Sequence, residues 1–305
     1  MTKKKLLEKL QGVEKMASGS KFKRMQQDPF KYINAILFRE LNYKRNKTEK
    51  EVIANTFFEE PMHLLLPSSM DIYLTGGKTH DSEIRLAKFL INNLESGETF
   101  IDVGTHYGYF SLLAAHLIGK EGQVYSFEAS PSTYKVLHKN TSNRQNVNSY
   151  NLAVSDEISE LTFYEFPNLY SEYNTLDVSQ FKNETWYSEY APKEVKIRSV
   201  ILDDFCNEKS VQPKIVKIDV EGAEFKVING LSTHLSKYAP LIAMEYLSDE
   251  RGSQEHQKAA QKLNALGYVS FIIDGEGNLK RVETISQYLK QKNMDSDNIV
   301  FVKGY

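Results

Sequence analysis

Three carboxylates stand within six residues in the run KIDVEGAE at 217–224. Asp219, Glu221 and Glu224 follow the apolar segment 215–218, which has the composition of a buried strand, and they precede a helix-like segment. Open α/β sheets bind their ligands outside the carboxyl ends of their strands. The run therefore predicts an acidic functional site at the end of this strand.

A second pattern, FIDVGTHYG at 100–108, joins an expected strand to an expected helix. Gly104 and Gly108 stand four residues apart, so the middle glycine of the dinucleotide fingerprint G-x-G-x-x-G is absent. Asp102 places a carboxylate where it would repel a phosphate and attract a cation. The loop therefore favours S-adenosylmethionine, which carries a sulfonium and an ammonium group and no phosphate, over NAD.

Polar groups also follow the next two expected strands. Glu128 ends the strand at 123–127, where a carboxylate can accept both hydroxyls of a ribose, and polar groups near Ser155 end the third strand, where they can read an adenine edge. Because parallel strands end at one edge of a sheet, we expect these groups to surround one ligand. The residues expected to contact the cofactor are Asp102, Gly104, Thr105, Tyr107, Gly108, Glu128, Ala153, Ser155 and Asp219.

The elements that must position these residues alternate between strand and helix from residue 99 onward. Strands are expected at 99–103, 123–127, 147–154, 214–218, 241–245, 269–273 and 298–302, with helices between several of them. This alternation predicts an α/β fold with a parallel sheet and crossover helices. Upstream, we expect a helix that starts at Asp28-Pro29 and runs through Tyr32, Ile33, Ile36 and Leu37. We also expect a connector at 46–52, short strands at 62–66 and 71–74, and a helix at 84–94.

We divide the 305 residues into a basic, helical N-terminal extension at 1–60 and a catalytic domain at 61–305. Within the domain, residues 161–190 hold nine aromatic residues without a helical stripe, which is typical of an insert or lid over a site. The single cysteine, Cys206, excludes an internal disulfide framework and a cysteine-based zinc site. Without an apolar run of about 18 residues or a signal-peptide core, a cytoplasmic protein is expected.

Charge is distributed unevenly along the chain. Residues 1–50 carry 14 Lys and Arg against 5 Asp and Glu, whereas the remaining residues carry 24 against 35. The basic arm would suit peripheral contact with an anionic membrane or another polyanionic partner. The alternative is a solvated helical extension that packs on the domain or on a second subunit of a homodimer.

Seven segments together resemble the FkbM-type methyltransferases, a branch of the class I S-adenosylmethionine-dependent enzymes. The resemblance covers roughly residues 60–305 and rests on FIDVGTHYGYFS at 100–111, FEASP at 127–131, AVSD at 153–156, LDDF at 202–205, KIDVEGAE at 217–224, Met244-Glu245 and NIVFVK at 298–303. It implies a doubly wound, mostly parallel, seven-stranded sheet and methyl transfer to a hydroxyl of a sugar in a glycan or glycosylated natural product. Thr105 and His106 replace the family's usual Ala-Asn pair, and FEASP replaces FEPNP.

A sugar hydroxyl is a poor nucleophile at neutral pH, so a base or a metal ion is expected to assist. Asp219 is the first candidate and Glu245 the second, and together they would offer hard oxygen ligands to Mg²⁺ or another divalent cation. The competing role for Asp219 is cofactor binding alone, and the sequence leaves both roles open. Glu221 and His106 complete the catalytic candidates, whereas Glu224 suits the first turn of a helix.

The aromatic insert provides the candidates for acceptor binding, because sugars stack on aromatic faces. We expect Trp186, Tyr187 and Tyr173 to contact the acceptor, and the alternative is a hydrophobic cluster or a dimer contact. The competing functions are methylation of another small molecule, a protein or a nucleic acid, an NAD-dependent oxidoreductase, and a non-catalytic S-adenosylmethionine-binding subunit. A nucleic acid partner is disfavoured because the catalytic part carries net negative charge.

Overall fold

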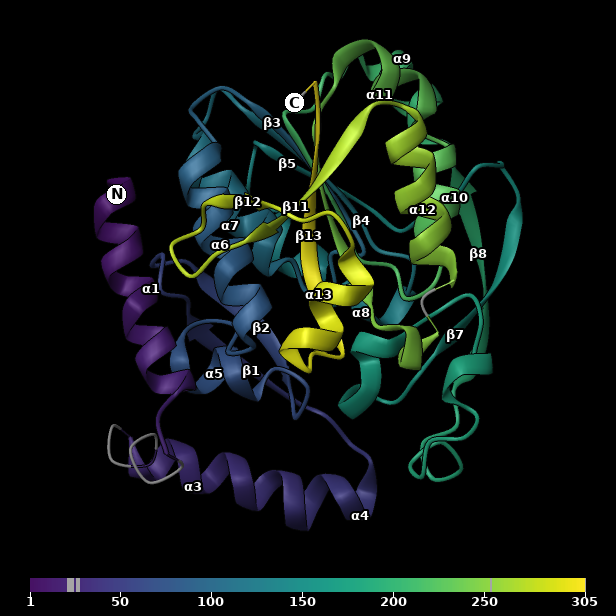
Figure 1. The fold of residues 1–305 in the computed structure, drawn as a ribbon. Helices are drawn as coiled ribbons and strands as arrows, with labels where there is room; N and C mark the ends of the chain where they lie inside the picture. The colour runs from purple at the N-terminus through teal and green to yellow at the C-terminus, as the bar shows by residue number, and fades with distance from the viewer. Residues whose placement is uncertain (21–24, 26–27, 253, 305) are drawn as a thin grey trace.

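The computed structural model describes residues 1–20, 25, 28–252 and 254–304. An eight-stranded sheet forms the centre of the molecule, with helices on both faces (Figure 1). Its strands, in spatial order, are β12 (Leu279–Arg281), β11 (Tyr268–Ile273), β13 (Ser296–Lys303), β10 (Leu241–Leu247), β9 (Ile215–Ile218), β3 (Thr99–Val103), β4 (Gln123–Phe127) and β5 (Val147–Tyr150).

The sheet is mostly parallel, as the alternation of elements predicts. Strands β5, β4, β3, β9 and β10 run in one direction, and β13 is antiparallel to both of its neighbours, β10 and β11. The first strand of this sheet, β3, lies in its middle. The following strands are added first on one side of β3 and then on the other, so the doubly wound fold is confirmed. The short edge strand β12, paired antiparallel to β11, is an eighth strand that the sequence did not predict.

Alternating residues of the central strands point to two separate cores. Phe100, Ile215 and Val300 pack into one core, whereas their neighbours Ile101 and Val216 pack into the other. The first core is shared with α6 (Asp81–Asn93), α7 (Tyr109–Ile118) and α8 (Pro131–Thr141). The second is shared with α9 (Leu202–Lys209), α10 (Glu224–Asn229), α11 (Ser232–Tyr238), α12 (Gln254–Ala265) and α13 (Ile285–Lys292).

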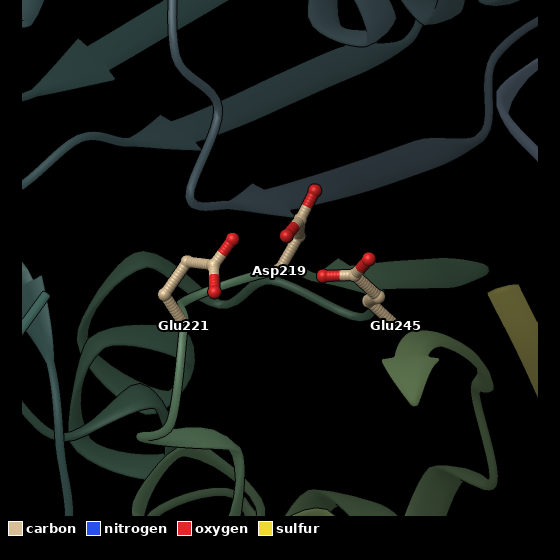
Figure 2. Close-up of side chains that lie close together, drawn as sticks. All are labelled: Asp219, Glu221 and Glu245. Carbon is tan, nitrogen blue, oxygen red and sulfur yellow. The ribbon is translucent and has the colours of Figure 1, made fainter. Parts of the chain in front are cut away.

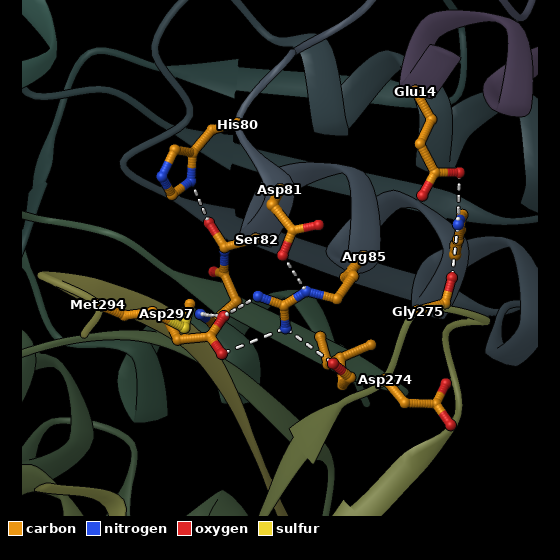
Figure 3. A network of polar contacts seen from close by, with 12 residues as sticks. Glu14, His80, Asp81, Ser82, Arg85, Asp274, Gly275, Met294 and Asp297 are labelled. Carbon is orange, nitrogen blue, oxygen red and sulfur yellow. Dashed lines mark hydrogen bonds and ion pairs between the residues drawn. The ribbon is translucent and has the colours of Figure 1, made fainter. Parts of the chain in front are cut away.

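A buried ion pair fastens α6 to the last strand of the sheet (Figure 3). The Arg85 guanidinium contacts the fully buried carboxylate of Asp297 on β13 through Nη2 and Oδ1 at 2.9 Å, and Nη1 donates to the carbonyl of Ile273 at 2.7 Å. One turn later, Lys88 contacts Glu14 of α1 (Lys3–Ala17) at 2.8 Å. Helices α1 and α6 are therefore held to each other and to the sheet.

The N-terminal segment contains the expected helices. Helix α3 (Pro29–Leu37) continues into the π-helical turn η1 (Phe38–Tyr43) and α4 (Lys44–Asn46), and Asp28 caps its start by accepting the Lys31 amide at 2.9 Å. Leu6, Leu10 and Val13 of α1 are buried in the first core.

Two local predictions upstream of the sheet are wrong. The last three residues of the connector expected at 46–52 belong to the strand β1 (Lys50–Asn55), which pairs antiparallel with β2 (Pro61–Leu66). The expected strand at 71–74 is the helix α5 (Met70–Thr75), whose Ile72 packs into the first core. Because β1 already pairs with β2, the following segment is free to form a helical turn against β1 and α1.

A second, three-stranded sheet follows the central parallel strands. It consists of β6 (Ala153–Val154), β8 (Lys193–Val200) and β7 (Glu160–Glu165), so the single strand expected at 147–154 is divided between two sheets. The aromatic insert between β7 and β8 forms the short turns η2 (Asn168–Tyr173) and η3 (Ser179–Phe181), and η4 (Asp249–Arg251) follows β10. Within the described ranges, no helix is both long and apolar enough to cross a membrane.

Candidate functional site

A cavity of about 390 Å³ lies at the carboxyl ends of β3, β4, β9 and β10. The register places these ends level, because Val103 of β3 lies opposite both Phe127 of β4 and Ile218 of β9. The residues that directly follow these strands therefore meet at one edge of the sheet. The cavity wall includes ten predicted site residues: Gly104, Thr105, His106, Tyr107, Glu128, Ala153, Tyr173, Asp219, Glu221 and Glu245.

Three carboxylates converge on one side of this cavity (Figure 2). Asp219 and Glu221 follow β9 and Glu245 lies on β10, and one oxygen of each lies within 4.8 Å of the others. Burial, followed by the charge of its neighbours, raises the pKa of both Glu221 and Glu245 well above the ordinary value. The Oε2 atom of Glu221 is buried and has no hydrogen-bond partner among the described residues. The cluster is therefore short of positive charge and suits a cation or a proton.

Lys217 is a member of the site that the sequence analysis missed. It lies two residues before Asp219 on β9, so both side chains share one face of the strand, and its Nζ lies 3.2 Å from Asp219 Oδ2 and 3.6 Å from Asp102 Oδ1. Burial opposes the charge of the ammonium, but the two carboxylates outweigh that effect and raise the pKa of Lys217. Lys217 is thus a fixed cation between the glycine loop and the acidic cluster.

Asp102 is fully buried and lies outside the cavity wall, against the prediction that it meets the cofactor. Its Oδ2 accepts the Thr105 hydroxyl at 2.5 Å and the Ser111 hydroxyl at 2.6 Å. The carboxylate points into the protein, where these two hydroxyls and the nearby Lys217 ammonium compensate its negative charge. Asp102 therefore stabilises the conformation of the glycine loop from the protein interior.

The glycine loop passes directly over the end of β9. Gly104 adopts a φ of +76°, and a Cβ there would lie 1.7 Å from the carbonyl oxygen of Asp219. Only glycine permits this approach of one backbone to the other. Gly108, with a φ of +92°, begins α7 behind the wall, where a Cβ would meet Leu137 at 2.8 Å.

Glu128 links the end of β4 to the glycine loop. Its Oε2 accepts the backbone amide of His106 at 2.8 Å and its Oε1 accepts that of Ser130 at 2.9 Å. Burial raises the pKa of Glu128 to about 8 despite these two donors. Each oxygen of a carboxylate has a second lone pair, so Glu128 keeps acceptor capacity toward the cavity.

His106 lines the cavity as a neutral ring. Burial lowers its pKa to about 4, its Nε2 lies 3.0 Å from the Ser171 hydroxyl, and its ring lies 3.9 Å from that of Tyr107. Ser155 lies outside the wall, because its amide donates to the carbonyl of Val200 at 3.0 Å in the second sheet. Both residues of β6, Ala153 and Val154, line the cavity.

Trp186 and Tyr187 also lie outside the cavity wall, against the prediction. Trp186 stacks on Tyr170 with ring centroids 4.0 Å apart, and Tyr187 packs edge-on against Phe166. The aromatic side chains pack against one another in a separate hydrophobic cluster. Of the three residues predicted to contact the acceptor, only Tyr173 lines the cavity.

The part of the cavity wall that Lys78, Glu83 and Glu172 form, here called the far wall, contains charged side chains that the sequence analysis did not identify. Lys78 contacts Glu83 of α6 at 3.3 Å and also pairs with Glu172 of η2. The pKa of Lys78 is raised well above its usual value, because nearby carboxylates outweigh its burial, and burial raises that of Glu83 to about 7. These residues come from distant segments of the chain, so no local spacing could have indicated their contact.

Comparisons with known proteins agree with the motifs. The family described as Methyltransferase FkbM domain matches residues 102–270. Among solved structures, the chain is similar to a precorrin-6y C5,15-methyltransferase from Geobacter metallireducens, at 14% identity over 73% of this chain and 88% of that one, with a TM-score of 0.40. No curated protein has a sequence that matches this chain.

Two further structures are similar at the same low level. The methyltransferase FkbM from Methylobacillus flagellatus is 13% identical over 77% of this chain, with a TM-score of 0.43, and this chain spans 52% of its length. A SAM-dependent O-methyltransferase from Thermotoga maritima is 14% identical over 83% of this chain and 78% of that one, with a TM-score of 0.38. At such values the likenesses carry no functional information.

Proposed function

We propose, because this chain belongs to the FkbM methyltransferase family, that it transfers a methyl group from S-adenosylmethionine to a hydroxyl of a sugar. The chain is a class I S-adenosylmethionine-dependent methyltransferase. The observation that carries the finer proposal is the convergence of Asp219, Glu221 and Glu245 on the cavity that the glycine loop and Glu128 also line.

The cavity fits a donor that has cationic groups and a ribose. Bound S-adenosylmethionine would supply a methyl group on a positively charged sulfur, ready for in-line displacement. Glu128 offers acceptor lone pairs for ribose hydroxyls, and the close approach of Gly104 to Asp219 keeps the loop backbone beside them. Carboxylates along the wall favour a cation and disfavour the pyrophosphate of NAD.

The acidic cluster supplies the base that a sugar hydroxyl requires. Glu221 and Glu245 lie close to each other and to Asp219, and burial, followed by the charge of neighbouring carboxylates, raises the pKa of both glutamates well above the ordinary value. A carboxylate with a raised pKa is a stronger base than an ordinary one. In its ionised form, Glu245 or Glu221 would take the proton of the acceptor hydroxyl. The acceptor oxygen would gain the methyl group as the bond from that carbon to sulfur breaks and S-adenosylhomocysteine leaves, while the Lys217 ammonium keeps Asp219 oriented.

The same cluster fits a divalent cation. Its three carboxylate oxygens lie within 4.8 Å of one another, and the buried Glu221 Oε2 has no other partner within the described parts of the chain. Carboxylate oxygens are the ligands that Mg²⁺ prefers. Asp219, Glu221 and Glu245 would hold the ion, which would supply Lewis acidity toward the acceptor oxygen.

A sugar is the favoured acceptor because its hydroxyls match a cavity with carboxylate acceptors and the ring of Tyr173. Sugar hydroxyls donate to carboxylates, and the apolar face of a sugar packs on an aromatic ring. A phosphate backbone would meet repulsion from the same carboxylates, which disfavours a nucleic acid acceptor.

Binding and turnover test the proposal separately. S-adenosylhomocysteine should raise the melting temperature of the protein and NAD should not. With simple glycosides as acceptors, Asp219→Asn and Glu245→Gln should lower kcat about 100-fold or more, since a general base contributes on the order of 10²–10⁴. Glu208→Gln, an exposed acid on α9, is the control and should leave kcat unchanged.

The outcomes also separate the roles of the cluster. Full turnover by both Asp219→Asn and Glu245→Gln would refute their chemical role, and stabilisation by NAD alone would refute the donor. Calorimetric binding of Mg²⁺ or Mn²⁺ that both variants lose would support the metal site. Turnover that survives EDTA unchanged would leave proton transfer to the carboxylates as the mechanism.

A further inference from the structure

The helix formed by α3, η1 and α4 carries an apolar stripe on its outer face. Phe30, Ile33, Leu37 and Leu41 are 83%, 45%, 48% and 63% exposed, and their spacing of three and four residues places them on one side. The helix over residues 29–46 is about 27 Å long at 1.5 Å per residue. It lies along one end of the molecule, beyond α5 and β1 (Figure 1). Four large apolar side chains in one row are therefore exposed to solvent.

This stripe does not hold the helix to the protein, because the opposite face does so. Tyr43 is fully buried, and its hydroxyl accepts the Leu169 amide of η2 at 3.0 Å. Just beyond the helix, the Lys47 ammonium lies 3.6 Å from the centre of the Tyr190 ring. Ala35 is also buried. The attachment is thus complete without the outer residues, which leaves their apolar surface to an external partner.

The charges beside the stripe indicate the kind of partner. Residues 29–46 contain four Lys and Arg and one acid, Glu40, which pairs with Arg39 and Lys44, so the segment keeps a net positive charge. The exposed Lys44 and Arg45 follow the C-terminal end of the stripe. The surrounding segment 1–50 has the same bias, with 14 basic residues against 5 acidic ones. A second copy of this face would bring like charges together, whereas an anionic lipid surface would attract them.

We propose that the outer face of residues 29–46 binds the surface of an anionic lipid bilayer, with the helix lying in the plane of the interface. The four apolar side chains enter the boundary of the acyl chains, and Lys44 and Arg45 contact lipid phosphates. This inference concerns a surface outside the cavity and does not depend on the methyl acceptor.

The arrangement brings the cavity close to the lipid surface. Tyr43 of the helix contacts η2 through Leu169, and Ser171 and Glu172 of that same turn line the cavity. A helix bound to lipid therefore holds one wall of the cavity at the membrane, where acceptors at the lipid interface are within reach.

Sedimentation with lipid vesicles tests the proposal on the full chain. The protein should bind vesicles of phosphatidylcholine and phosphatidylglycerol and bind pure phosphatidylcholine weakly, with affinity that falls as salt rises. Each basic residue near an anionic surface contributes about 1 kcal/mol, or about a factor of five. The variant Lys44→Gln/Arg45→Gln should therefore bind about 25-fold more weakly.

Matched variants distinguish this surface from general charge or hydrophobicity. Phe30→Ser/Leu37→Ser should weaken binding at least tenfold at an unchanged melting temperature, because these side chains are exposed. Lys290→Gln/Lys292→Gln, on exposed positions of α13, and Ile158→Ser, 69% exposed, are the controls and should bind as the parent does.

Three outcomes would overturn the proposal. One is equal binding by parent and both helix variants. Another is absence of binding by the parent to anionic vesicles. The third is a dimer in light scattering that Phe30→Ser/Leu37→Ser converts to a monomer without any lipid binding, which would assign the stripe to a second copy of the chain.

Discussion

The buried Lys217 between two carboxylates gives the sharpest test of how the site is held together. Lys217→Met keeps most of the apolar stem and removes the ammonium, which lies 3.6 Å from Asp102 and 3.2 Å from Asp219. Asp102 is fully buried and Lys217 is 2% exposed, so water cannot replace the lost partner. Asp219 is partly exposed and loses less. The substitution therefore acts mainly by leaving the charge of Asp102 uncompensated.

The expected size follows from the contacts that remain. Removing one partner of a buried ion pair costs about 3–5 kcal/mol. Asp102 keeps the hydroxyls of Thr105 and Ser111 at 2.5 and 2.6 Å, so we expect the lower end, about 3 kcal/mol of unfolding free energy. Lys217→Met/Asp102→Asn removes both charges of the pair. The loss of unfolding free energy in the double variant should therefore be smaller than the sum of the two single losses by about 2 kcal/mol.

Urea unfolding of the parent, the two single variants and the double variant measures this coupling. Work at neutral pH is suitable, because the raised pKa of Lys217 means that its contribution is complete below the ordinary pKa of 10.5 and is lost only as the pH rises above it. Lys209→Met, an exposed lysine paired with Glu208, is the control and should change stability by less than about 0.5 kcal/mol. Additive single effects, within about 0.5 kcal/mol, would refute the coupling between Asp102 of β3 and Lys217 of β9.

Two further predictions concern burial and pH. Arg85→Met leaves Asp297 buried without its cation and should lower the free energy of unfolding, measured by heating, by about 3–5 kcal/mol. Arg281→Met changes an exposed residue and should have little effect. Equal effects of the two variants would contradict the role of the buried pair. Because burial raises the pKa of Glu128 from 4.5 to about 8, the folded state retains a proton that the unfolded state has lost between these values. The unfolding free energy should fall across that window by up to about 1.4 kcal/mol per pH unit, and Glu128→Gln should flatten the slope; an unchanged slope would show that Glu128 does not titrate there.

The side of the cavity formed by the glycine loop and the strand ends was predictable because its residues occupy local motifs at strand ends. Gly104, Glu128 and Asp219 each follow a strand directly, and parallel strands of a doubly wound sheet end at a common edge. The order of motifs along the chain was therefore enough to bring them together. The same reasoning placed Glu245 at the end of the neighbouring strand, within reach of Asp219.

The direction in which a side chain points was decided only by the tertiary structure. Both aspartates were expected at strand ends, but Asp102 lies within β3, opposite Lys217, whereas Asp219 directly follows β9. Asp102 points into the protein, where Thr105, Ser111 and Lys217 surround it. Trp186 turns away from the cavity because other aromatic rings pack on it.

Contacts between distant segments were equally inaccessible to sequence patterns. Lys78 and Glu172 meet in the cavity wall although 94 residues separate them, and Tyr43 reaches Leu169 across 126 residues. The sequence alone determined the sheet, the glycine loop and the strand-end acids, since these follow from short-range periodicity and turn chemistry. The tertiary structure decided the far wall of the cavity and which face of the N-terminal helix is exposed, because both depend on packing between segments that no local spacing relates.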